Sequence, residues 1–239
     1  MSETYNLKLP LILPGQAQKH VTVNEALAML DAVAQLRLVA RGVNTPPNSP
    51  VDGAAWDVGQ SPTGLWAGQA GKLAIASNGG WVFVAPKTGW RCWDEALGQS
   101  AVYGGSAWVA NALHAAPSGA ATTGQIAEIT HVLTAGATNT TSAIIPQNAV
   151  VIGVTGRVKA AITGAGVTGW KLGVTGSNNR YGSGLGIGLN SYAHGVTAQS
   201  QAYYAATSLL LTAEGGNFAA GGQIKLAVHY LLLAPPSAV

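Results

Sequence analysis

Alternation of apolar and polar residues constrains this chain more than any other sequence feature. It is clearest in "IKLAVHYLLL" at residues 224–233, where every second residue is large and apolar. The apolar members are Ile224, Leu226, Val228, Tyr230 and Leu232, and the intervening residues are Lys225, Ala227 and His229. Successive side chains of a β-strand point to opposite faces, so this stretch predicts a strand with one face in a core and the other in solvent.

A second stretch, residues 150–159, has a similar pattern. Val150, Ile152, Val154 and Val158 alternate there with Val151, Thr155, Arg157 and Lys159. Further strands are expected near residues 125–134, 169–175, 185–189 and 208–212. Several half-buried strands in succession indicate two packed sheets, so we expect residues 125–239 to form a β-sandwich of the jelly-roll kind.

The composition agrees with a mainly β protein. The chain has 239 residues, of which 48% are hydrophobic, so it can bury a substantial core. Its 32 glycines, with frequent threonine, valine and tryptophan, favour short strands joined by tight turns over a helical bundle. No apolar run reaches the length needed to span a membrane, and we expect no membrane insertion.

One helix is expected near the N-terminus. Thr22 and Glu25 stand three residues apart, as in a capping box, in which each side chain satisfies a free backbone N–H of the helix start. Residues after them recur at three- and four-residue steps and predict a helix over about 23–39 with one apolar face. Its members are Val23, Leu27, Leu30, Val33, Ala34 and Arg37. Lys19 and His20 are then turn residues or partner contacts rather than catalysts.

Six of the seven tryptophans fall between residues 51 and 109. They are Trp56, Trp66, Trp81, Trp90, Trp93 and Trp108. "NGGWV" and "GGSAWV" each place a Gly-Gly turn before a tryptophan, which is a hairpin pattern. Two interpretations remain open: a compact sheet with a tryptophan core, or an exposed aromatic platform for sugars.

Three segments follow from these patterns. Residues 1–110 form an N-terminal domain with the helix and the tryptophan-rich sheet. Residues 111–124, "NALHAAPSGAATTG", are small and polar and are expected to form a linker. Residues 125–239 form the C-terminal sandwich.

Charge and cysteine content limit the function classes. Only 9% of residues are charged and the net charge is +3, without the dense basic stripe that neutralises phosphates, so nucleic acid is not an expected ligand. Cys92 is the single cysteine, which excludes an intrachain disulfide and suggests a packed core thiol. The first residues, "MSETYNLKLPLILPG", lack the long apolar core of a secretion signal, so we expect synthesis in the cytoplasm without a signal peptide.

The N-terminal segments resemble a known group of proteins. "LPLILPGQAQKHVTVNEALAMLDAVAQL", "PPNSPVDGAAWDVG", "GLWAGQAGKLAIASNGGWVFVAPKTGW" and "GGSAWV" occur in this order over about residues 5–110. Together they resemble a domain of tail-fibre and spike proteins from phages and from the phage-like gene transfer agents of alphaproteobacteria. The resemblance is closest to the gene transfer agent head spike.

This resemblance implies a function and partners. Members of the family act as receptor-binding fibres for host capsule polysaccharide, which implies a place on the surface of a phage-like particle. The N-terminal domain is then expected to attach to the particle or to a companion spike protein. Fibres of this kind are commonly trimeric, and Leu231 and Leu233 fall opposite the core residues of their strand, where a homotrimer would cover them.

Candidate sugar-binding residues cluster between residues 170 and 204. Aromatic faces suit the apolar C–H patches of sugars, and Asn, Arg and His side chains can bond to their hydroxyl groups. The expected carbohydrate-binding residues are Trp170, Asn178, Asn179, Arg180, Tyr181, Tyr192, His194, Tyr203 and Tyr204. We expect "SNNRYGSGLG" and "NSYAHG" to be loops, for which an ordinary solvated turn is the alternative interpretation.

Catalysis is less well supported. Only Glu128 and Glu214 follow Glu95 as carboxylates, so a glycosidase in the C-terminal domain would have to use this pair. The histidines lack metal-ligand spacing, and no metal, cofactor or catalytic residue is expected. Three hypotheses remain, in this order: a carbohydrate-binding spike, a structural adaptor between a particle and another fibre protein, and a polysaccharide depolymerase.

Overall fold

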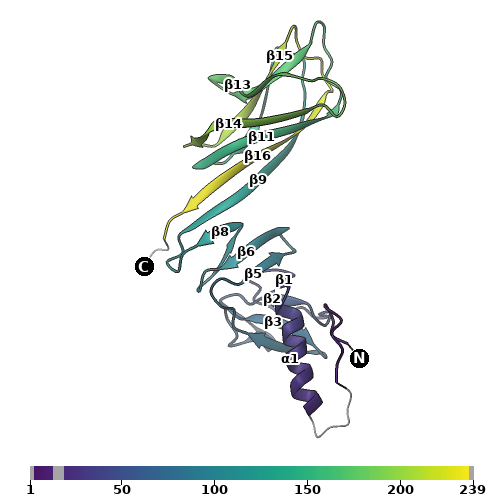
Figure 1. The fold of residues 1–239 in the computed structure, drawn as a ribbon, viewed down its shortest axis with the longest axis vertical. Coiled ribbons are helices and arrows are strands. Elements are labelled where there is room, and N and C mark those ends of the chain that lie inside the picture. The colour runs from purple at the N-terminus through teal and green to yellow at the C-terminus, as the bar shows by residue number, and fades with distance from the viewer. Residues whose placement is uncertain (1–2, 13–18, 237–239) are drawn as a thin grey trace. The chain divides into compact units, whose positions relative to one another are not determined.

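The computed structural model describes residues 3–12 and 19–236, and the chain is mainly β, as expected (Figure 1). It divides into two compact units. The first contains the residues up to Ala121 together with the C-terminal residues from Ala234, and the second is Thr122–Leu233. Within residues 111–124, for which a linker was expected, the chain forms strand β8 (Ala112–Ala115) and the beginning of β9 (Ala121–Val132).

The first unit contains a seven-stranded sheet and one short 3₁₀ helix, η1 (Gly64–Trp66). Its strands are β1 (Arg37–Leu38), β2 (Ala55–Asp57), β3 (Leu73–Ser77), β4 (Gly80–Val84), β5 (Arg91–Asp94), β6 (Gln99–Tyr103) and β7 (Trp108–Ala110). Their order is β4-β3-β2-β1-β5-β6-β7. The central strand β1 runs parallel to both neighbours, whereas the other pairs are antiparallel. The two glycine-turn hairpins were therefore predicted correctly.

The helix α1 (Lys19–Val33) overlaps the expected range of about 23–39 but begins and ends earlier. Thr22 lies within the helix, so the capping-box interpretation was wrong. The helix ends at Val33 because residues 37 and 38 hydrogen-bond between β2 and β5 as the central strand β1. The expected apolar face was also wrong, since Leu30 is 51% exposed.

Polar residues of α1 hold the N-terminal segment instead. The buried Asp31 carboxylate accepts hydrogen bonds from the Thr4 hydroxyl at 2.7 Å and from the N–H of Asn6 at 2.8 Å, and another from the N–H of Leu7. Asn24 exchanges two bonds with the backbone of Ile12. Burial acts to raise the pKa of Asp31, but these hydrogen bonds outweigh it and lower the pKa below its ordinary value.

Tryptophan side chains fill the core on one face of this sheet. Trp56, Trp66 and Trp81 pack with ring centroids 5.0 to 6.3 Å apart, in tilted and edge-to-face arrangements. Trp93 is the exception, being 48% exposed. Cys92 is buried, as expected, and burial raises the pKa of its thiol to about 11.

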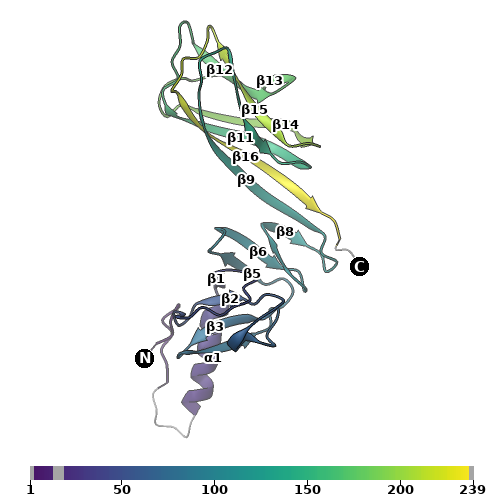
Figure 2. The same cartoon turned by 180° about the vertical axis from the view of Figure 1, so that it is seen from behind.

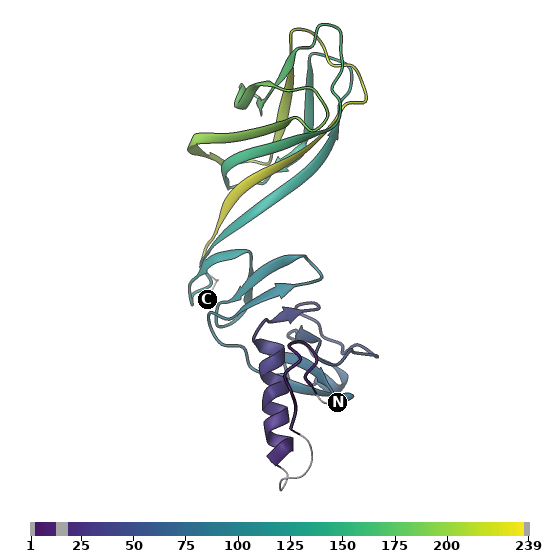
Figure 3. The same ribbon diagram turned by 45° about the vertical axis from the view of Figure 1, so that its right-hand side comes forward.

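The second unit is a jelly roll of two four-stranded sheets (Figures 2 and 3). Besides β9, its strands are β10 (Thr138–Ile145), β11 (Ala149–Ala160), β12 (Gly169–Val174), β13 (Ser177–Leu185), β14 (Tyr192–Tyr203), β15 (Thr207–Glu214) and β16 (Gln223–Ala234). One sheet has the order β10-β15-β12-β13, and within this unit the other has the order β14-β11-β16-β9. This is the strand order of two Greek keys folded as a jelly roll, which confirms the expected sandwich.

The alternation of β16 was predicted correctly, since Ile224, Leu226, Val228 and Tyr230 are buried. On β11, however, Val151, Val154 and Val158 are buried, and Ile152 is exposed rather than buried as expected. The cause is a register shift between Val151 and Gly153, where a β-bulge inserts an extra residue and reverses the side-chain direction.

Two segments expected to be loops are strands. "SNNRYGSGLG" lies mostly in β13, and "NSYAHG" leads into β14. Residues 185–189, expected to be a strand, lie mainly in the connection between these two strands. Among the described residues, no helix has the length and apolar character needed to cross a lipid bilayer.

Candidate functional site

A groove of about 410 Å³ lies on the outer face of the sheet β14-β11-β16-β9. It is lined by Glu128, Thr155, Gly156, Arg157, Lys159, Tyr192, Ala193, His194, Lys225 and Ala227. All ten residues belong to the second unit, and they come from all four strands of this sheet. The groove is therefore built by strand pairing rather than by loops.

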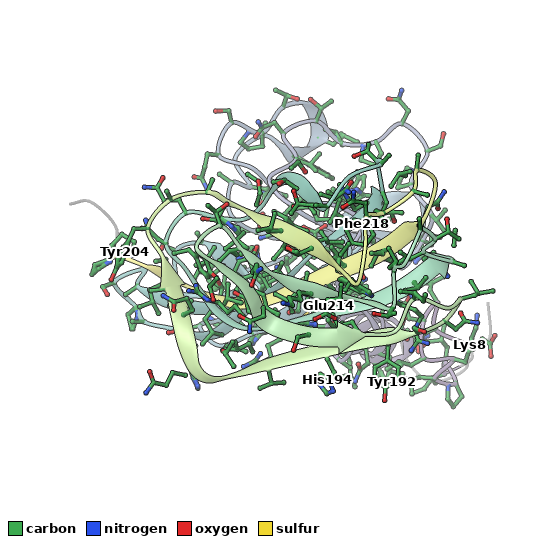
Figure 4. The ribbon with its side chains drawn as sticks, turned by 90° about the horizontal axis from the view of Figure 1, so that it is seen from above. Lys8, Tyr192, His194, Tyr204, Glu214 and Phe218 are labelled. Carbon is green, nitrogen blue, oxygen red and sulfur yellow. The ribbon has the colours of Figure 1, made fainter. Side chains whose placement is uncertain are left out.

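Strand alternation directs the polar side chains into this groove. Ala193 and Gly195 of β14 are buried against the core, so Tyr192 and His194 point outward. Figure 4 shows these two side chains next to each other on β14. Val154 and Val158 of β11 face the core. Thr155, Arg157 and Lys159, which alternate with these core residues, consequently point into the groove.

A row of three residues crosses the groove. Arg157 of β11 stands opposite Tyr192 of β14 on one side and opposite Lys225 of β16 on the other. Its guanidinium carbon lies 5.9 Å from the centre of the Tyr192 ring, within cation–π range, and its Nη1 donates to the carbonyl of Asn190 at 3.0 Å. The Tyr192 side chain is 68% exposed, so its ring is accessible to a ligand.

Glu128 supplies the acidic side of the groove. Its Oε2 lies 2.9 Å from Lys225 Nζ, and both side chains are about half exposed. A neighbouring row places His194 opposite Thr155, whose hydroxyl lies 3.0 Å from His229 Nε2. The groove thus combines one accessible aromatic ring with cationic and hydrogen-bonding groups.

Three of the expected sugar-binding residues are buried, and their assignment is corrected. Trp170 is packed between the sheets, and its indole N–H donates to the carbonyl of Gly186 at 3.0 Å. The hydroxyls of Tyr181 and Tyr203 lie 2.6 Å apart inside the core. Burial and this hydrogen bond raise the pKa of Tyr181 above its ordinary range. Rings enclosed in this way cannot stack on a sugar.

The remaining expected residues lie in different places. Arg180 donates to the Tyr203 hydroxyl at 3.1 Å, and Asn178 and Asn179 are exposed on β13 in the opposite sheet. Tyr204 is 82% exposed but does not line the groove. Of the nine expected residues, only Tyr192 and His194 line the groove.

Four charged groove residues were not among the expected site residues. They are Glu128, Arg157, Lys159 and Lys225. The alternation pattern had placed Arg157, Lys159 and Lys225 on solvent-facing sides of their strands, but it carried no information on which strands are neighbours. Strand pairing across 68 residues of sequence is what places Arg157 beside Lys225.

The carboxylate pair considered for glycoside hydrolysis is not assembled. Glu128 is exposed on the outer face of the groove sheet, between Ala127 and Ile129, which pack toward the core. Glu214 belongs to the other sheet, where Ala213 packs toward the core. Glu214 lies 3.8 Å from Lys171 and accepts a bond from the N–H of Gly184. The two carboxylates therefore face opposite sides of the sandwich, and they cannot flank one glycosidic bond.

A second depression, of about 400 Å³, lies in the first unit beside Arg41, Asp57, Tyr103 and Trp108. Its ionic groups are already engaged within the fold. Arg41 Nε lies 2.6 Å from the buried Asp94, and Asp57 accepts the N–H of Gly42 at 3.0 Å. Burial raises the pKa of Asp57.

Among the described residues, no three His, Cys, Asp or Glu side chains are grouped as a metal site would require.

Part of the chain is similar in sequence to a known protein family, and part is similar in structure to solved proteins. Residues 23–109 match a family described as "Protein of unknown function (DUF2793)", which covers less than half of the chain. No curated protein matches.

Two solved capsid structures contain similar chains. One belongs to the capsid asymmetric unit of cyanophage Pam1, with 21% identity and a TM-score of 0.35, covering 46% of this chain and 84% of that one. The other is from the capsid of the Helicobacter pylori bacteriophage KHP30, with 12% identity and a TM-score of 0.33, covering 48% and 96%. Similarity at this level does not define a function for the chain.

Proposed function

We propose that this protein is a component of a phage-like particle that binds polysaccharide on the surface of a host cell. The single observation that carries the proposal is the groove on the jelly roll, where the exposed Tyr192 ring stands beside Arg157 and His194. The resemblance of the N-terminal sequence to spike and tail-fibre proteins supports the particle assignment. Capsular polysaccharide is the receptor that this resemblance implies.

Sugar chemistry fits the side chains of the groove. A pyranose ring presents an apolar C–H face that packs on an aromatic ring, and its hydroxyls need donors and acceptors around that ring. Tyr192 supplies the ring, whereas Thr155, His194 and Arg157 supply hydrogen-bonding groups. The groove lies on the exposed face of a sheet rather than in a closed cavity, which also suits a polymer.

The test is binding of the purified protein to capsulated cells and to matched cells without capsule. Tyr192→Ala should weaken binding to capsulated cells by roughly fivefold, since a stacking aromatic contributes on the order of 1 kcal/mol. Tyr204→Ala is the matched control, because Tyr204 is also largely exposed but lies outside the groove. Equal binding to both kinds of cell would refute the proposal.

We also propose that the first unit attaches the protein to the particle or to a companion spike. Its surface carries exposed apolar side chains, among them Leu65, Trp93 and Leu97. Partner surfaces commonly cover such residues. A chain lacking residues 1–110 should lose incorporation into particles and keep polysaccharide binding. Normal incorporation of the shortened chain would contradict this assignment.

A homotrimer is the proposed assembly. Leu233 is 69% exposed at the end of β16, Ile126 is exposed on the adjacent strand β9, and Val196 is exposed on β14 of the same sheet. A threefold contact would cover Leu233, while the groove lies near Lys225 at the start of β16. Light scattering should then give about three times the chain mass of 24.1 kDa. A concentration-independent mass of one chain would exclude the trimer.

The adaptor hypothesis remains the alternative. It would be favoured if the protein bound particle components and no glycan. The depolymerase hypothesis loses its basis, since Glu128 and Glu214 lie on separate sheets.

A further inference from the structure

The net charge of the chain is concentrated in the jelly roll. Thr122–Leu233 contains five of the twelve Lys and Arg residues but only two of the nine Asp and Glu residues, so it accounts for the whole formal net charge of +3. Three of these five cationic residues, Arg157, Lys159 and Lys225, line the groove. The other two are engaged elsewhere, Lys171 near Glu214 and Arg180 at the Tyr203 hydroxyl.

The groove has more positive than negative charge. Glu128 is its one lining carboxylate, and it pairs with Lys225. In the part of the chain that the structure describes, no carboxylate lies within ion-pair distance of Arg157 or Lys159. Two cationic side chains are therefore available to a ligand.

The strand register places like charges together. Arg157 and Lys225 stand directly opposite each other on adjacent antiparallel strands, an arrangement that destabilises a sheet. Core packing does not require two cationic residues at these positions, because both side chains lie on the outer face, where neutral residues would fit equally well. An anionic ligand at Arg157 would compensate the repulsion.

From these observations we propose that the groove binds an acidic polysaccharide, with a sugar ring on Tyr192 and a carboxylate of the polymer at Arg157 and Lys159. The inference rests on the proposed polysaccharide-binding function and specifies its ligand class. A carboxylate next to the stacked ring would meet the Arg157 guanidinium, which already lies over that ring. Guanidinium groups bind carboxylates through two parallel hydrogen bonds.

Nucleic acid is the other anionic polymer to consider, and the groove suits it less well. Proteins that follow a phosphate backbone without sequence preference use long cationic tracks and several stacking aromatics. Here the cationic side chains number three and one of them is paired with Glu128, while Tyr192 is the single aromatic residue that lines the groove.

The experiment uses the full chain and a panel of purified bacterial capsular polysaccharides that contain uronic acids. Each polymer is compared with its own carboxyl-reduced form, with neutral capsular polysaccharides and with a single-stranded oligonucleotide. We expect at least one acidic polymer to bind roughly tenfold more tightly than its reduced form, with affinity falling as salt is raised.

Variants identify the groove as the site. Arg157→Gln and Lys159→Gln should each weaken binding to the acidic polymer by roughly three- to tenfold. Glu128→Gln should strengthen it by about twofold or more, because Lys225 is released and a negative charge is removed. Lys171→Gln is the matched control, since it makes the same charge change on the opposite sheet and should leave binding unchanged.

The outcomes separate the two proposals. Equal binding of the acidic and reduced forms, or binding of neutral polymers alone, would overturn the acidic specificity and leave polysaccharide binding intact. Equal or tighter binding of the oligonucleotide would overturn the ligand class. Failure to bind any polysaccharide, in the panel or on capsulated cells, would overturn the proposed function itself. Equal losses in the Arg157 and Lys171 variants would overturn the placement in the groove.

Discussion

Arg157 of β11 and Lys225 of β16 face each other in antiparallel register on the outer face of the jelly roll. Lys225 is partly neutralised by Glu128, 2.9 Å away, whereas the one hydrogen bond of the Arg157 side chain among the described residues goes to the carbonyl of Asn190, and its guanidinium lies over the Tyr192 ring. The groove thus contains an electrostatic repulsion that a bound anion would relieve.

This repulsion is measurable as a coupling energy. A double-mutant cycle of Arg157→Gln and Lys225→Gln should give an unfavourable coupling of roughly 0.2 to 1 kcal/mol, from urea unfolding followed by circular dichroism. The coupling should shrink at about 1 M salt, where charges are screened. The corresponding cycle of Glu128→Gln and Lys225→Gln should give a favourable coupling. A zero or favourable value for the Arg157 pair would mean that the two cations do not repel each other.

The buried tyrosine pair should affect stability and not binding. Tyr181→Phe removes one hydroxyl while Tyr203 keeps its bond from Arg180, so unfolding free energy should fall by about 1 kcal/mol. Tyr203→Phe leaves both the Tyr181 hydroxyl and Arg180 without this partner, and should cost more, roughly 1 to 3 kcal/mol. Urea unfolding gives both values. Weaker polysaccharide binding by either variant, at a temperature where it is folded, would return these residues to the site.

Gly195 controls the position of the strand that carries Tyr192 and His194. A Cβ at Gly195 would lie 2.2 Å from the carbonyl oxygen of Tyr181, closer than atoms can approach. Gly195→Ala should therefore destabilise the jelly roll by roughly 1 to 3 kcal/mol and weaken groove binding through displacement of β14.

Gly188→Ala is the control for that substitution. A Cβ there would meet its nearest neighbour, Ser191 Oγ, at an ordinary 3.7 Å. Thermal unfolding of both variants makes the comparison. Equal melting temperatures would show that β14 does not approach β13 as closely as this geometry requires.

Asp31 should make the first unit sensitive to acid. Its folded-state pKa is lowered below the ordinary 3.8, so its stabilisation is complete above that value and is lost as the pH falls through the folded-state pKa. Asp31→Asn should lower the unfolding free energy at pH 7 by about 1 to 3 kcal/mol, and the difference from wild type should shrink as the pH falls below 3.8 and through the folded-state pKa.

Glu25→Gln provides the control on the same helix, because the Glu25 side chain is exposed. Urea unfolding at a series of pH values gives the comparison. A deficit of the Asp31 variant that persists unchanged in acid would mean that its charge does not hold the N-terminal segment.

The sequence determined the fold class and the orientation of several strands. Alternation alone identified the core face of β16 and placed Lys225 on the opposite face, because the two-residue period of a strand is a local property. The Gly-Gly turns identified two hairpins, because the conformation of a tight turn is also a local property. The pattern did not reveal the bulge at Val151 and Gly153, which depends on the neighbouring strands.

The helix and the polar strands show where local patterns were insufficient. The spacing of Thr22 and Glu25 predicts a capping box, but α1 begins at Lys19. The helix also ends earlier than its pattern predicts, because Arg37 and Leu38 pair between two other strands. The glycine, serine and asparagine residues of β13 are residue types that are common in turns. They form a strand nevertheless, because β12 supplies a ladder, and Gly173 allows the close approach of Ser177 and Asn178.

Only the tertiary structure decided the site. Glu128, Arg157, Tyr192 and Lys225 lie on four strands that are far apart in sequence, and the Greek-key pairing makes those strands neighbours. Periodicity states which face a side chain occupies, but the partners on that face depend on long-range hydrogen bonding and on burial of one shared core. The same long-range packing placed Trp170, Tyr181 and Tyr203 inside that core, although their residue types alone are equally suited to a sugar-binding surface.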